Sequence, residues 1–99
     1  MDAGERRNRF GCHAIRDFGS RDRIVYVHFR SVNGHAPRFT ETFINTGNVN
    51  VRKAMQACRA VGFTGFFLDD HVPQLINDPE MRASHAYALG YIQALLDGV

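Results

Sequence analysis

The chain has 99 residues, 44% of them hydrophobic and 22% charged, which is the composition of one small globular domain. Its formal net charge of +2 is too small to predict a nucleic-acid partner, and no stretch approaches the roughly 20 apolar residues of a membrane helix or the apolar core of a signal peptide. Two cysteines, Cys12 and Cys58, cannot form a disulfide framework, so we expect a cytoplasmic protein with reduced thiols and no membrane partner.

Residues 1–20 are predicted to form a largely irregular N-terminal leader. Residues 1–13 mix glycine, arginine, asparagine and acids without a helical or strand period, and residues 14–18 suit only one helical turn. Such an arginine-rich segment can bind phosphate, but we interpret it as a solvated leader. The folded part is then residues 21–99. The arginines of the first quarter are Arg6, Arg7, Arg9, Arg16, Arg21 and Arg23.

Residues 24–30 are predicted to form a central parallel strand, because they are β-branched or aromatic on both faces. Alternation along the strand places His28 and Arg30 on the same face, near the carboxyl end. A histidine in a strand is ordinarily a hydrogen-bonded core residue. An arginine beside it on the same face favours a site that binds a carboxylate.

Residues 31–48 form a long connection in which only residues 38–44 suit an extended segment. Connections of this length are commonly binding loops or lids. Asn50 is then predicted to cap a helix that ends at Gly62. Its apolar stripe has helical spacing and includes Met55 and Cys58, which we interpret as core residues.

Residues 63–68 are predicted to form a second strand that runs into Asp69-Asp70-His71. An acid that caps a helix beside a surface histidine is one interpretation. The other is a metal site, since carboxylate and imidazole groups bind hard or borderline divalent ions. A last helix is predicted from Asp78-Pro79 to Leu96, with His85 and Tyr87 in its first half.

The predicted order of strand, helix, strand and helix indicates an α/β fold with a parallel sheet. In such sheets the chemistry lies at the carboxyl ends of the strands, where His28, Arg30, Asp70 and His71 all fall. This agreement favours a functional site over the simpler interpretations. Two strands are few for a stable sheet, so we expect self-association or membership in a longer protein.

Four segments carry a resemblance to a known family. They read RDRIVYVHFRSV at residues 21–32, RFTETF at 38–43, DDHVP at 69–73 and ALGYIQALL at 88–96. In order and spacing they closely resemble the C-terminal part of D-mannonate dehydratase, which is similar to the xylose-isomerase-like TIM barrels. The resemblance implies a βαβα fragment that corresponds to the last two β/α units of a (β/α)₈ barrel. Residues 21–99 are then the incomplete C-terminal part of that domain.

The resemblance also implies a function. The family dehydrates D-mannonate to 2-keto-3-deoxy-D-gluconate with Mn²⁺ or Fe²⁺ in hexuronate breakdown, and we expect the full-length protein to be a homo-oligomer. The matching positions make His28 and Asp70 metal ligands and His71 an acid/base group beside the metal. The family's catalytic tyrosine falls, in some members, where this chain has His85, which leaves Tyr87 as a nearby candidate. Arg30 suits contact with the substrate carboxylate by its face and charge.

The chain also departs from the family's pattern. The family's other two metal ligands, a histidine and a cysteine on earlier strands, would lie before residue 1, and Cys12 and His13 do not fit those positions. We therefore expect the fragment alone to be inactive. Two alternatives stay open: a non-catalytic, self-associating βαβα remnant, and a fragment of another sugar-isomerase-like barrel. The only lysine, Lys53, lies on a predicted helix exterior, which counts against an isomerase.

Overall fold

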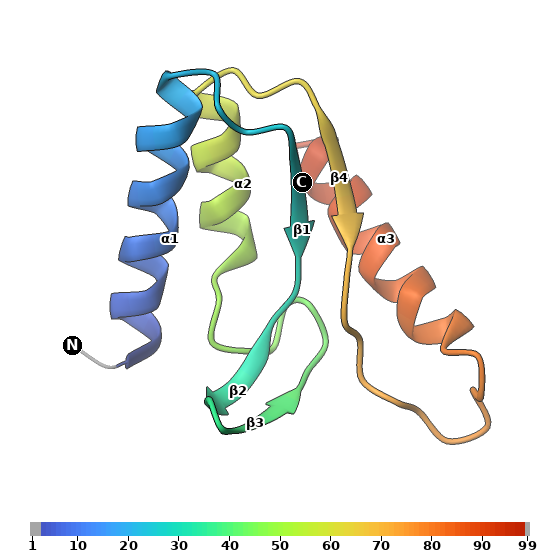
Figure 1. Cartoon of the computed structure of the whole chain (residues 1–99). Helices are drawn as coiled ribbons and strands as arrows, with labels where there is room; N and C mark the ends of the chain where they lie inside the picture. The colour runs from blue at the N-terminus through green and yellow to red at the C-terminus, as the bar shows by residue number, and fades with distance from the viewer. Residues whose placement is uncertain (1–2, 99) are drawn as a thin grey trace.

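The computed structural model describes residues 3–98 and combines three helices with four short strands in that part of the chain. Figure 1 shows β1 and β4 side by side, with α1 and α2 to their left in the view and α3 to their right. No helix within residues 3–98 is long and apolar enough to cross a membrane. In chain order, the elements are α1 (Ala3–Ser20), β1 (Tyr26–Phe29), β2 (Val32–His35), β3 (Arg38–Glu41), α2 (Val51–Ala60), β4 (Phe66–Asp69) and α3 (Arg82–Leu96).

The predicted parallel pair of strands is confirmed. β1 pairs with β4 in parallel, from Tyr26 opposite Phe66 to Phe29 opposite Asp69, and α2 lies between them in the chain. Each strand has four residues, so the strands are shorter than the predicted ranges 24–30 and 63–68. Both strands therefore end at the same edge of the sheet, where their carboxyl-end side chains can meet.

The prediction of an irregular leader over residues 1–20 is wrong for the described part. Residues 3–20 form α1, which packs against α2, while residues 1–2 lie outside the described residues. Gly19 allows the close approach, because a Cβ atom there would lie 2.5 Å from Cγ2 of Val61. The apolar residues Ala14, Ile15 and Phe18 do have helical spacing, and Ile15 packs against the core, but they are few among glycines and charged residues, so the prediction missed the helix.

The long connection after β1 contains a hairpin. β2 and β3 pair antiparallel, with His35 opposite Arg38 across a turn at the cis Ala36–Pro37 bond. The extended segment predicted at residues 38–44 is confirmed over residues 38–41, and its partner strand was missed. Gly34 has φ +90°, a conformation that suits glycine. Because glycine is uncommon within strands, its presence weakened the sequence signal for a strand at residues 32–35. The hairpin lies beyond the carboxyl end of β1 (Figure 1).

The sheet is covered on one face only within the described residues, whereas the sequence predicts burial on both faces. Phe29 belongs to the buried core, against which Val27 and Phe67 pack. On the opposite face Tyr26, Phe66 and Leu68 are exposed. The remaining core residues come from the connection and the helices: Ile44, Val51, Ala54, Met55, Ile92 and Leu95.

Local signals at the helix ends explain where α2 and α3 begin. The Asn50 side chain accepts a hydrogen bond from the Lys53 backbone N–H at 3.0 Å, so the predicted cap of α2 is confirmed. The last helix begins at Arg82 rather than at the predicted Asp78-Pro79. The Asp78 carboxylate nevertheless accepts hydrogen bonds from the backbone N–H groups of Ala83 and Ser84, at 3.1 and 3.2 Å. Asp78 therefore caps the first turn of α3 from a position before the helix.

Cys58 makes the stability of the chain depend on pH. Burial raises the pKa of the Cys58 thiol above its ordinary value of 9.0, and the nearby Cys12 adds to the shift. The folded state therefore disfavours the thiolate, so this contribution to stability is complete below pH 9 and is lost as the pH rises further. We expect the urea midpoint to fall more steeply from pH 8 to pH 10 in the wild type than in Cys58→Ala. Equal slopes in the two proteins would contradict this expectation.

Candidate active site

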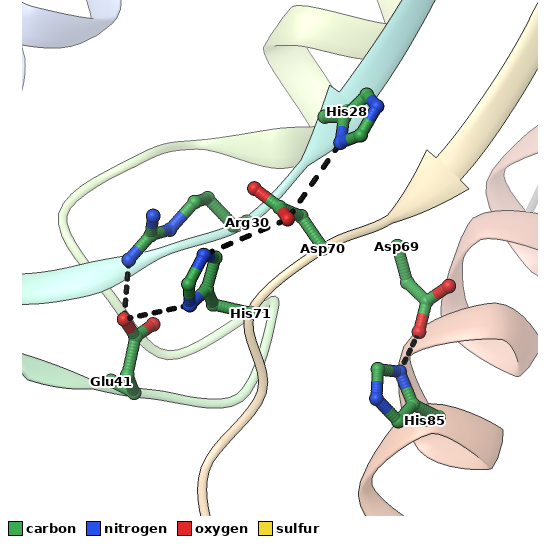
Figure 2. A network of polar contacts seen from close by, with 7 residues as sticks. All are labelled: His28, Arg30, Glu41, Asp69, Asp70, His71 and His85. Atoms are coloured by element: carbon green, nitrogen blue, oxygen red, sulfur yellow. Dashed lines mark hydrogen bonds and ion pairs between the residues drawn. The ribbon is translucent and has the colours of Figure 1, made fainter.

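The candidate site lies at the carboxyl ends of β1 and β4. His28 is in β1 and Arg30 follows it, while Asp70 and His71 follow β4. Because Phe29 lies opposite Asp69, the next residue of each strand, Arg30 and Asp70, also lie near each other. Figure 2 shows the side chains of His28, Arg30, Asp70 and His71 gathered at this edge. The convergence predicted from the sequence is therefore present, while the roles of the residues stay predictions.

His28 and Asp70 form the pair that the resemblance assigns to a metal. Nδ1 of His28 lies 3.7 Å from Oδ1 of Asp70, which is too long for a hydrogen bond. The two side chains are 45% and 32% exposed, so both can reach a ligand from solvent. His28 lies on the open face of the sheet, with its ring centroid 5.2 Å from that of Tyr26.

The donor atoms of this pair fit a divalent ion in part. Metal–ligand distances of about 2.0–2.3 Å place neighbouring ligand atoms roughly 3–4 Å apart, so the spacing of His28 and Asp70 suits two ligands of one ion. Nitrogen and oxygen donors together suit Mn²⁺ or Fe²⁺. Within the described part of the chain, however, no group of three His, Cys, Asp or Glu residues could hold a metal ion. The described residues thus offer two candidate donors and no third one.

His71 lies between two carboxylates. Its Nε2 atom is 3.8 Å from Oδ1 of Asp70, and its Nδ1 atom is 3.7 Å from Oε1 of Glu41. The ring is exposed, and neither distance is that of a hydrogen bond. An accessible imidazole close to both a candidate metal ligand and a second acid can move a proton at either ring nitrogen.

Arg30 already has an anionic partner inside the chain. Its guanidinium donates to the Glu41 carboxylate and lies 5.9 Å from the ring centroid of Phe39. Oε2 of Glu41 is buried and has no hydrogen-bond partner among the described residues. The sequence prediction missed Glu41. Its signal was its place within the extended segment predicted at residues 38–44, in the connection that was predicted to be a binding loop or lid.

His85 and Tyr87 differ in where they lie. Nδ1 of His85 contacts the Asp69 carboxylate, and His85 lines a pocket together with Asp70 and His71. The Tyr87 hydroxyl instead donates to Oδ1 of Asn45 at 2.8 Å and does not line this pocket. The pocket has a volume of about 560 Å³. Its lining is completed by Thr40, Glu41, Val72, Pro73, Gln74 and Met81.

Comparison with known proteins supplies a family and a fold. The sequence model of the family described as D-mannonate dehydratase (UxuA) matches residues 6–99. The solved structure of a mannonate dehydratase from Streptococcus suis serotype 2 matches with a TM-score of 0.71 and 20% identity, which shows the fold alone. The match covers 85% of this chain and 26% of that one, so the chain spans about a quarter of that structure's length. The comparison with curated proteins finds no match to the sequence.

Proposed function

Since the chain belongs to the D-mannonate dehydratase family, we propose that it carries part of the active site of a metal-dependent sugar-acid dehydratase. The observation that carries the proposal is the meeting of His28, Asp70 and His71 at one sheet edge, with successive separations of 3.7 and 3.8 Å. His28 and Asp70 are the proposed ligands of Mn²⁺ or Fe²⁺. Because the described residues offer no third donor, the proposal requires further ligands from elsewhere in the complete protein or from a second copy.

We place the chain in the last two β/α units of a (β/α)₈ barrel. β1 and β4 would be the seventh and eighth strands, with the exposed face of Tyr26, Phe66 and Leu68 turned to the barrel interior. The exposure of this apolar face in residues 3–98 supports the proposal, because further strands would cover it. A homo-oligomeric full-length enzyme in the cytoplasm fits the family's metabolic role and stays a prediction.

The proposed reaction removes a weakly acidic proton beside the carboxylate of D-mannonate and expels a hydroxyl group from the neighbouring carbon. A bound divalent ion supplies stabilisation of the negative charge that develops at the carboxylate. His71 can take or return a proton at the ring nitrogen that faces the substrate. Arg30 can hold the substrate carboxylate beside Glu41, since a guanidinium has five N–H donors and the contact with Glu41 engages one of its nitrogens.

Dehydration of D-mannonate by the purified 99-residue chain tests this proposal. With Mn²⁺ present we expect negligible activity from a folded chain, because two ligands hold such an ion weakly. We also expect Mn²⁺ to broaden the NMR signals of His28 and Asp70 selectively. Broadening spread over the surface, with none at these residues, would reject the metal site. Metal-dependent activity of the chain would show that copies of the chain complete the site themselves.

A self-associating module without catalysis is the second candidate function. The exposed apolar face of the sheet favours it, since Phe66 and Leu68 would be protected by contact with another copy. Light scattering after size exclusion separates the two candidates. A concentration-dependent mass that persists without Mn²⁺ binding supports the module. A monomer that binds Mn²⁺ at His28 and Asp70 supports the partial active site.

A further inference from the structure

We propose that Asp69 is a positioning residue that holds His85 with Nδ1 protonated, so that Nε2 is presented to the pocket as a proton acceptor. The chemical use of His85 rests on the proposed dehydratase function, while its orientation rests on contacts within the chain. The Asp69 carboxylate contacts Nδ1 of His85, as Figure 2 shows. The two residues come from different elements, the end of β4 and the first turn of α3.

The pair is held by rigid elements on both sides. Asp69 is the last paired residue of β4, opposite Phe29, and its side chain is only 16% exposed. The His85 backbone N–H donates to the Met81 carbonyl at 2.9 Å, and α3 packs against β4. A side chain placed by a strand and a helix is oriented more tightly than one placed by loops.

The adjacent acids of the Asp69-Asp70-His71 motif serve opposite faces of the sheet. Successive residues of a strand point to opposite sides. Asp69 accordingly lies on the side of Phe67 and α3, whereas Asp70 approaches His28 on the open side. The motif therefore supplies one carboxylate to the candidate metal pair and another to His85.

The carboxylate determines which nitrogen of His85 is available. An ionised carboxylate only accepts hydrogen bonds, so Nδ1 must carry the proton in the contact with Asp69. In the neutral ring, Nε2 then has a free lone pair. No hydrogen bond or ion pair of the described residues uses Nε2, and the 41%-exposed side chain lines the pocket with Asp70 and His71. His85 can therefore accept a proton from a molecule in this pocket, as a second acid/base group beside His71.

The tautomer of His85 in the metal-free 99-residue chain tests this proposal. Long-range ¹H–¹⁵N correlation spectra of ¹⁵N-histidine protein distinguish the two ring nitrogens at a pH where the ring is neutral. We expect the Nδ1–H tautomer in the wild type. We expect Asp69→Asn, which removes the charge but keeps the size, to shift the tautomer ratio at least about tenfold toward Nε2–H, because a charge-assisted hydrogen bond is lost.

Two further variants complete the experiment. Asp69→Glu retains a carboxylate and is expected to restore the Nδ1–H tautomer, which a purely structural role of Asp69 would not require. Asp97→Asn is the matched control, since among the described residues its exposed carboxylate accepts a hydrogen bond from Gln93 alone and the tautomer of His85 should not change. An Nε2–H tautomer in the wild type overturns the proposal without any variant. Failure of Mn²⁺ to bind would reject the dehydratase site and leave the tautomer result standing.

Discussion

Replacing Phe67 by alanine is expected to destabilise the chain by about 2–3 kcal/mol, less than for a fully buried aromatic residue, because Phe67 is partly buried against the core. The ring centroid of Phe67 lies 5.4 Å from that of Phe29 and 5.3 Å from that of Phe63. The rings of Phe67 and Phe63 meet edge-on. Its neighbour Phe66 is 79% exposed on the other face of β4. The same substitution there should change the free energy of unfolding by no more than about 0.5 kcal/mol. Because small domains are only marginally stable, Phe67→Ala should remove a large share of the free energy of unfolding.

Urea denaturation followed by circular dichroism measures both variants under the same conditions. Phe66→Ala is the matched control, since it makes the same chemical change one residue away. Comparable losses in both variants would contradict a sheet that is covered on one face. They would mean that the open face is buried in solution, and a mass measured at two concentrations would then show whether a second copy covers it.

Local sequence signals predicted the parts of the fold that depend on neighbours in the chain. The cap at Asn50 and the apolar stripe of α2 can both be recognised from nearby residues in the sequence. The order of the elements then implied the parallel pairing of β1 and β4. Helix α1 has a weaker signal, because its few apolar residues stand among glycines and charged residues, and its packing against α2 is not visible in the sequence. The one-sided covering of the sheet was missed for a related reason. An apolar residue such as Phe66 marks a face suited to burial, whatever part of the protein covers it.

The candidate site was predictable where strand geometry alone places residues. Alternation put His28 and Arg30 on one face, and the parallel order brought Asp70 and His71 to the same edge. The partners of these residues were not predictable, because they depend on the hairpin and on the docking of α3. Glu41 reaches Arg30 from β3, and Asp69 contacts His85 from β4. The spacing of residues along the chain does not show which acid will contact which base when the two lie in different elements.

Removing either proposed metal ligand is expected to lower the affinity of the chain for Mn²⁺ at least about 100-fold. Loss of a group that only supports a metal ligand commonly costs 10- to 100-fold, and loss of a ligand itself should cost no less. His28 and Asp70 are 3.7 Å apart, and the described residues offer no cluster of three that could replace the missing donor. The variants are His28→Ala and Asp70→Ala, and broadening of neighbouring NMR signals by Mn²⁺ measures binding even when it is weak.

Two controls separate a ligand from a neighbouring group in this experiment. His13→Ala removes an exposed imidazole on α1 and should leave Mn²⁺ binding unchanged. His71→Gln removes the proposed acid/base group, whose Nε2 atom lies 3.8 Å from Oδ1 of Asp70, and should also preserve binding. If His71→Gln abolished binding while His28→Ala did not, the residues that follow β4 would hold the ion without His28. The acid/base role would then pass to His85, the imidazole that Asp69 contacts and that lines the same pocket.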